Sequence, residues 1–179
     1  MHSVICPSVR ATQTLAAQIG KLAQPGTVLL LRGDLGGGKT TFTQGLGRGL
    51  GIEERIVSPT FTLIQEYEEG RIPLFHCDLY RLQAEDTFDL QLDEYCAGEG
   101  VTVIEWPDRW LDCPPTWLEL YFRVVNDDTR EIAPKAQGDY HEKLWERASA
   151  RWKTILDNEN DILDNENDVL DNENDVYED

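Results

Sequence analysis

The strongest signal in this sequence is the run Gly33-Asp34-Leu35-Gly36-Gly37-Gly38-Lys39-Thr40-Thr41. It fits the phosphate-binding pattern G-x-x-x-x-G-K-[ST] at every constrained position. The apolar residues 27–32 predict a buried strand before the loop, and residues 39–46 are typical of a helix start. A strand, a glycine loop and a helix in this order predict an α/β fold of the P-loop NTPase-like type. A chance glycine-rich turn is the alternative, and the two matching flanks argue against it.

The residue types of this loop suit a phosphate chain. Backbone N–H groups can surround crowded anions only where side chains stay clear, and glycine has no Cβ and accepts positive φ angles. The helix that follows points its first N–H groups at the same anion. We expect the Lys39 ammonium to reach the β- and γ-phosphates and the Thr40 hydroxyl to bind Mg²⁺. The predicted nucleotide-binding residues of the loop are Gly36, Gly37, Gly38, Lys39, Thr40 and Thr41.

Charge and cysteine usage limit the class of protein. Residues 157–179 contain 11 of the 34 acidic residues and no Lys or Arg, so residues 1–156 carry a net charge of only −7. This mildly acidic body argues against a broad nucleic-acid-binding surface. The four cysteines form no C-x-x-C pair, which argues against a zinc site and favours reduced thiols. We see no signal peptide and no membrane-spanning apolar run, and we expect a cytoplasmic protein.

Three later segments carry candidate site residues. In Ile56-Val57-Ser58-Pro59-Thr60-Phe61-Thr62, two hydroxyl side chains flank a proline. A nucleotide switch uses such groups to contact the γ-phosphate or Mg²⁺, and Ser58 and Thr60 are therefore candidates for nucleotide binding. An ordinary Ser-Pro turn is the alternative, and this segment alone does not separate the two.

The second segment is a predicted β-hairpin formed by residues 63–67 and 72–78 around a polar turn that contains Gly70. Its second strand carries His76 and Asp78 on one face, because their side chains alternate with that of Cys77. This pair could orient a water molecule or belong to the Mg²⁺ shell, and we assign Asp78 to catalysis and metal binding. A structural His–Asp hydrogen bond is the alternative.

The third segment is Val101-Thr102-Val103-Ile104-Glu105-Trp106-Pro107, a short β-branched run that ends in a carboxylate. An acidic strand end near Mg²⁺ is the second part of many P-loop sites. Glu105 is therefore a candidate metal ligand and a candidate catalytic residue that polarises the attacking water. Trp106 lies against the nucleotide site or packs in the core, and we favour packing.

The remaining pattern completes a three-layer fold with a mixed sheet that includes an antiparallel hairpin. Residues 8–23 and 140–155 have helical apolar stripes, and residues 116–125 and 130–134 read as paired strands. Residues 1–156 are thus the predicted P-loop ATPase domain. Residues 157–179 form an acidic tail with a seven-residue repeat. A coiled coil built from this repeat would have a poor apolar seam, and a calcium site would lack the glycine of the EF-hand loop. We expect this tail to be disordered.

Together these motifs resemble the TsaE (YjeE) family, P-loop ATPases of tRNA threonylcarbamoyladenosine biosynthesis. The resemblance covers about residues 8–125. It rests on the phosphate loop, where the family usually has alanine in place of Gly37, and on three runs that are more specific to the family. These runs are Ser58-Pro59-Thr60-Phe61-Thr62, His76-Cys77-Asp78-Leu79-Tyr80-Arg81-Leu82 and Ile104-Glu105-Trp106-Pro107. The repeat tail lies outside the family pattern.

The resemblance implies a protein that binds and hydrolyses ATP with Mg²⁺. It implies work with the TsaD–TsaB heterodimer, which transfers the threonylcarbamoyl group to N6 of adenosine 37 in ANN-decoding tRNAs, so tRNA would be contacted only through that complex. By motif position, Lys39 would hold phosphates and Thr40 would bind Mg²⁺. Asp78 and Glu105 would serve the metal and the attacking water. A small P-loop kinase and a nucleotide-gated binding module without turnover are the alternatives.

Overall fold

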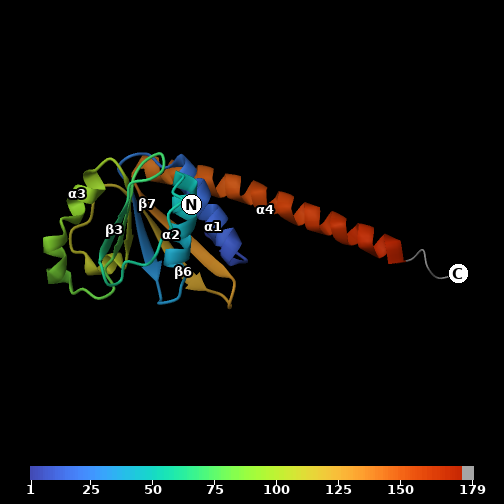
Figure 1. Ribbon diagram of the computed structural model, residues 1–179, viewed down its shortest axis with the longest axis horizontal. Helices are drawn as coiled ribbons and strands as arrows, with labels where there is room; N and C mark the ends of the chain where they lie inside the picture. The colour runs from blue at the N-terminus through green and yellow to red at the C-terminus, as the bar shows by residue number, and fades with distance from the viewer. Residues whose placement is uncertain (175–179) are drawn as a thin grey trace.

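The computed structural model describes the chain from residue 1 to residue 174, and the side chains up to residue 158. Strands and helices alternate through most of it (Figure 1). In chain order the elements are β1 (Val4–Cys6), α1 (Val9–Leu22), β2 (Thr27–Gly33), α2 (Lys39–Leu50), β3 (Ile64–Tyr67), β4 (Leu74–Asp78), the 3₁₀ helix η1 (Ala84–Leu90), α3 (Leu92–Ala97), β5 (Val101–Glu105), the 3₁₀ helix η2 (Pro107–Arg109), β6 (Trp117–Val124), β7 (Arg130–Gln137) and α4 (Asp139–Asn174).

The strands form one mixed seven-stranded sheet in the order β1-β7-β6-β2-β5-β4-β3. The four central strands run parallel, with β2 between β6 and β5 and with β4 beside β5. Antiparallel partners close both sides, where β3 pairs with β4 and where β7 pairs with β6 and β1. The predicted mixed sheet and its antiparallel hairpin are therefore confirmed. Strand β1 was not among the predicted elements, since its three residues are too few for a periodic pattern.

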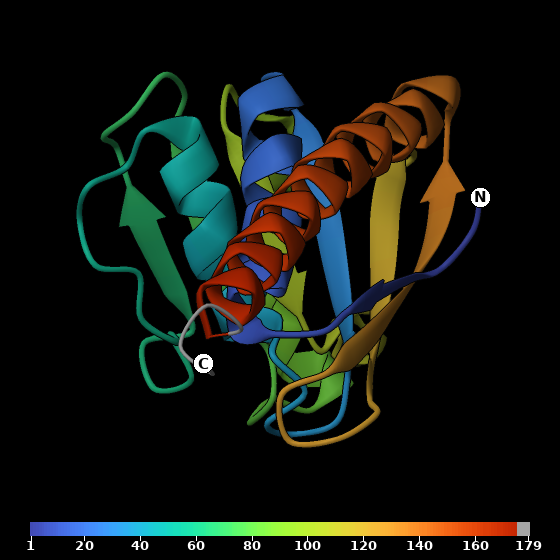
Figure 2. The same ribbon diagram turned by 90° about the vertical axis from the view of Figure 1, so that its right-hand side faces the viewer.

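Helices α1, α2 and α4 cover one face of the sheet, and η1 and α3 lie over the other (Figures 1 and 2). The main apolar core lies under the first layer, and a smaller cluster built around Val28, Leu30 and Ile104 lies under the second. These central strands are buried on both faces, which explains their continuous apolar runs.

Helices α1 and α2 approach each other closely because glycines of α2 face α1. A Cβ at Gly45 would lie 2.4 Å from the Gln13 carbonyl oxygen, and one at Gly49 would lie 2.3 Å from that of Ala17. Gly45 and Gly49 thus pack against a helix rather than against the sheet. The close approach fixes α2, whose first residue follows the phosphate loop, against α1.

The first half of α4 docks on the body of the protein. Trp145 and Trp152 are buried, and the Trp152 indole N–H donates to the Ala11 carbonyl at 2.9 Å. Helix α4 then continues to Asn174, and its far end projects away from the sheet (Figure 1). Residues 157–174 thus have a helical backbone, whereas the sequence predicts a disordered tail. The helix can continue through them because the repeat contains no Gly or Pro to end it. The division of the chain at residue 157, and disorder of the tail in solution, stay predictions.

All four cysteines are free, and only Cys113 is exposed. No helix within residues 1–174 is both long enough and apolar enough to cross a membrane.

Candidate active site

The phosphate loop joins β2 to α2 at the carboxyl edge of the parallel strands. Gly36 and Gly38 adopt positive φ angles of 76° and 101°, a conformation that glycine tolerates and other residues rarely adopt. Gly37 does not have a positive φ, and a Cβ there would lie 2.9 Å from the Asp34 carbonyl oxygen, so a larger residue would require a small shift of the loop. The positive-φ reason that we gave for all three glycines therefore holds for two of them.

Lys39 is the first residue of α2, and its side chain folds back into the loop. Its ammonium donates to the carbonyl oxygens of Gly33 at 2.8 Å and Asp34 at 3.0 Å. It also lies 4.2 Å from the ring centroid of Trp106, a cation–π contact. Burial lowers the pKa of Lys39, and the nearby carboxylates of Glu105 and Asp78 oppose that effect. The lysine side chain is therefore buried in the loop, close to the carboxylates of the site.

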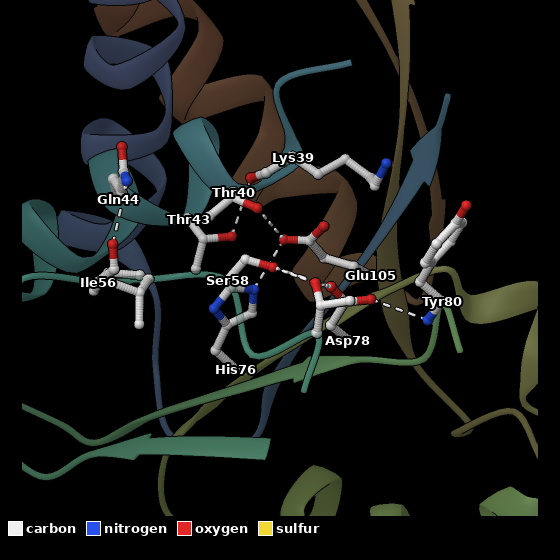
Figure 3. Close-up of polar contacts among 12 residues, drawn as sticks. Lys39, Thr40, Thr43, Gln44, Ile56, Ser58, His76, Asp78, Tyr80 and Glu105 are labelled. Carbon is white, nitrogen blue, oxygen red and sulfur yellow. Dashed lines mark hydrogen bonds and ion pairs between the residues drawn. The ribbon is translucent and has the colours of Figure 1, made fainter. Parts of the chain in front are cut away.

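Glu105 ends β5 and is almost fully buried. Its Oε1 atom accepts a hydrogen bond from the Thr40 hydroxyl at 3.0 Å and lies 2.9 Å from His76 Nε2 (Figure 3). Among the described residues, the other ring nitrogen of His76 has no hydrogen-bond partner, although the side chain is fully buried. His76 thus contacts Glu105 rather than Asp78, and the structural His–Asp hydrogen bond that we considered is absent from the described residues.

Asp78 ends β4, beside Glu105 in the register of the sheet. Its Oδ2 atom accepts from the hydroxyls of Ser58 at 3.1 Å and Thr60 at 2.5 Å, and these two hydroxyls lie 2.7 Å apart. Its Oδ1 atom accepts from the Tyr80 backbone N–H at 3.0 Å. The loop that precedes β3 is therefore attached to the site through one carboxylate.

Two further contacts anchor that loop. The Gln44 side-chain amide of α2 donates to the Ile56 carbonyl at 3.2 Å (Figure 3). The buried Tyr67 hydroxyl accepts from the Val57 backbone N–H at 3.1 Å. Because Gln44 lies one helical turn after Thr40, the same helix contacts Glu105 and positions the Ser58–Thr60 segment.

A cleft of about 190 Å³ lies above the ends of β2, β4 and β5. All ten predicted site residues line it, namely Gly36, Gly37, Gly38, Lys39, Thr40, Thr41, Ser58, Thr60, Asp78 and Glu105. This convergence follows from the register, since Leu31, Glu105 and Asp78 stand side by side at the carboxyl ends of three parallel strands, where open α/β sheets bind ligands.

Sequence reasoning missed other residues of the site. Leu35 and Tyr80 also line the cleft. Trp106, for which we favoured packing, lines the cleft and contacts Lys39 and the Tyr80 ring, so the other alternative, a place against the candidate nucleotide site, fits the geometry. Trp106 adopts φ 61° and ψ 49°, a left-handed conformation that is uncommon for a bulky residue. Arg130 lies against the outer side of the loop. Its position at the start of a strand gives no periodic signal of this contact.

The comparisons with known proteins agree with this geometry. Residues 6–132 match the family model described as threonylcarbamoyl adenosine biosynthesis protein TsaE. The chain is 45% identical over 139 residues to the TsaE protein of Bacillus subtilis, covering 77% of this chain and 87% of that protein. It is 44% identical over 140 residues to the TsaE protein of Nostoc, covering 75% and 86%.

A solved structure has the same fold. The crystal structure of YdiB from Bacillus subtilis superposes with a TM-score of 0.71 at 38% sequence identity, covering 84% of this chain and 95% of that one. The family match extends over most of the chain and includes every residue of the cleft. The chain belongs to the TsaE family.

Proposed function

We propose that this protein binds and hydrolyses ATP with Mg²⁺ and that its nucleotide cycle supports threonylcarbamoyladenosine modification of adenosine 37 in ANN-decoding tRNAs. It would do so in the cytoplasm with the TsaD–TsaB heterodimer, which performs the transfer, and its activity alone would be weak. The observation that carries the proposal is the convergence of all ten predicted site residues on one cleft in a member of this family.

The phosphate loop would hold the nucleotide. The backbone N–H groups of Gly36, Gly38 and the start of α2 offer hydrogen bonds and a favourable dipole to an anion, while the Gly37 N–H donates to the Asp34 carbonyl at 3.0 Å. The Lys39 ammonium, which now donates to two loop carbonyls, is within the same cleft and would exchange these partners for phosphate oxygens. A charged donor is worth about 1.5–3 kcal/mol per hydrogen bond, so Lys39 is expected to dominate affinity.

The residues of the cleft fit Mg²⁺ because they are hard oxygen donors. Mg²⁺ is usually held by one or two carboxylates together with substrate phosphates and water. Thr40, Asp78 and Glu105 supply one hydroxyl and two carboxylates around the cleft. When bound there, the cation would neutralise the charge that develops on the transferred phosphoryl group.

Glu105 is the residue best suited to activate water. It is a buried carboxylate with one oxygen engaged by Thr40 and His76, so the direction of the second oxygen is set by those contacts. A carboxylate that is fixed in this way can polarise a water molecule toward the terminal phosphate. Ser58 and Thr60 share one oxygen of Asp78, so any change in the partners of Asp78 would reach the loop that precedes β3.

Phosphate release tests this proposal. We expect Mg²⁺-dependent release of phosphate to water, slow for the protein alone and faster with TsaD–TsaB present. Removal of Mg²⁺ by EDTA should abolish it. Transfer of the phosphate to a small-molecule acceptor would support a kinase instead, and binding of ATP without turnover even in the presence of the heterodimer would support a nucleotide-gated binding module.

A further inference from the structure

Arg130 is the first residue of β7, far in sequence from the phosphate loop, yet its guanidinium lies against that loop. Its Nε–H donates to the Gly37 carbonyl at 3.1 Å, and its Nη2 group lies 3.5 Å from the Gly36 carbonyl oxygen. These are the two loop residues before Gly38, which is the N-cap of α2. Arg130 therefore binds the outward-facing carbonyls of a loop whose N–H groups serve the cleft.

The same guanidinium also closes the turn between β6 and β7. Its Nη1 group donates to the carbonyl oxygens of Asn126 at 2.8 Å, Asp127 at 3.1 Å and Thr129 at 3.0 Å. One side chain thus contacts five backbone carbonyls in two segments. Arginine suits this task because its planar fork carries five N–H donors, whereas lysine offers a single compact charge.

The backbone of Arg130 is anchored in the sheet. It stands opposite Val124 of β6 and opposite Cys6 of β1, so it lies between two paired strands. The side chain therefore connects a rigid part of the sheet with a glycine-rich loop that has few side chains of its own to hold it. Such a loop loses more conformational freedom on ordering than other segments, and a fixed contact reduces the part of this cost that falls on ligand binding.

We propose that Arg130 is a positioning residue that holds the phosphate loop in its nucleotide-binding shape and thereby sets nucleotide affinity. The inference rests on the proposed function, since it concerns the same nucleotide site. Arg130 acts through the Gly36 and Gly37 carbonyls on the side of the loop away from the cleft. Its loss should weaken binding and accelerate nucleotide dissociation, while the turnover of the saturated enzyme stays close to that of the wild type.

The test compares Arg130→Ala, Arg130→Gln and Arg130→Lys in the full chain, with ADP as the ligand. Dissociation constants come from calorimetry, dissociation rates from stopped-flow fluorescence of a labelled ADP, and folding from thermal melts. We expect the Ala and Gln variants to bind ADP about tenfold more weakly, equivalent to ~1.4 kcal/mol. The Lys variant should recover part of the affinity, and kcat/KM for ATP should fall while kcat changes little.

Arg123→Ala is the matched control, because Arg123 lies on the same hairpin and pairs with Glu131 at 3.2 Å while its side chain is 69% exposed. It should bind ADP as the wild type does. Equal ADP binding by the wild type and all three folded Arg130 variants would overturn the inference. An equal loss in Arg123→Ala would do the same, by pointing to general weakening of the hairpin. Absence of ADP binding by the wild type would instead overturn the proposed function and the inference with it.

Discussion

The nucleotide cleft and the acidic end of α4 use charge in opposite ways. In the cleft, Lys39, Asp78 and Glu105 are buried. Lys39 donates to carbonyl oxygens at the phosphate loop, Asp78 accepts from hydroxyls of the loop that precedes β3, and Glu105 accepts from the Thr40 hydroxyl of α2. Residues 157–179 carry 11 acidic residues, nine of them in a seven-residue repeat, and the helical part of this segment leaves the body of the protein (Figure 1). A buried charge must be paired at a defined position, whereas a repeated charge outside the core changes little except the net charge. We therefore assign the chemistry to the cleft alone.

The largest effect should follow from Lys39→Ala. This change removes the buried ammonium of the phosphate loop, and we expect ATP affinity to fall about 100-fold or more, since several charged hydrogen bonds are lost together. Calorimetry with ATP measures it. Lys143→Ala, which removes an exposed lysine of α4, is the control and should bind normally. Near-normal ATP binding by folded Lys39→Ala would show that this cleft is not the nucleotide-binding site.

Glu105→Ala should separate binding from hydrolysis. We expect ATP binding to persist and hydrolysis to fall about 100-fold or more, the usual contribution of a general base. Phosphate release at saturating ATP checks this, and Glu99→Gln, which alters an exposed carboxylate, serves as the control. Equal hydrolysis by the wild type and Glu105→Ala would show that Glu105 does not activate the attacking water.

His76 should have a smaller effect, because it acts through Glu105. We expect His76→Leu to lower kcat about tenfold, or ~1.4 kcal/mol in activation free energy, with little change in the KM for ATP. His76→Gln keeps an N–H donor in reach of Glu105 and should recover part of the rate. If both variants fold and keep the wild-type kcat, the contact of 2.9 Å between His76 and Glu105 has no catalytic role.

Much of the site could be predicted from the sequence, because its parts are local. The glycine loop, the carboxylate that ends β5 and the Ser-Pro-Thr segment each carry their chemistry within a few consecutive residues. The partners of these residues could not be predicted in the same way. His76 and Asp78 alternate on one strand, but only the register of β4 beside β5 determines that His76 contacts Glu105. Arg130 contacts the phosphate loop only because the order of strands in the sheet brings the start of β7 close to it. Strand β1 is too short to show a sequence pattern of its own.

Stability should also depend on pH through His141, which lies away from the cleft at the start of α4. Its Nε2 atom accepts from the Val28 backbone N–H at 3.3 Å, and burial lowers its pKa from 6.5 to about 4. The unfolded chain therefore binds a proton at His141 more readily than the folded protein does. The contribution of neutral His141 to the free energy of unfolding is fully present above pH 6.5 and is lost as the pH drops toward 4. Between pH 7.5 and 5.5 we expect a loss of about 1 kcal/mol in the free energy of unfolding.

Urea unfolding at the two pH values measures this loss. In His141→Gln the difference should shrink, because the titrating group is gone while a polar side chain remains. An unchanged pH dependence in that variant would show that His141 does not cause it.

The smallest effect is expected for the acidic residues 157–179. Deletion of residues 157–179 should change ATP hydrolysis less than about twofold, because the far end of α4 projects away from the sheet that carries the cleft (Figure 1). A large loss of activity would show that the tail contributes to function. Far-UV circular dichroism of the same pair of proteins tests the prediction of disorder. An unchanged helical signal would support it, and a loss of helical signal on deletion would contradict it.

We propose that nucleotide binding in this cleft supports tRNA modification by partner proteins. Threonylcarbamoyladenosine formed per tRNA, measured with TsaD–TsaB, its substrates and either the wild-type chain or Lys39→Ala, tests this most directly. We predict repeated rounds of modification with the wild type and no stimulation by Lys39→Ala. Equal stimulation by the two proteins would show that nucleotide binding by Lys39 is not what supports the modification.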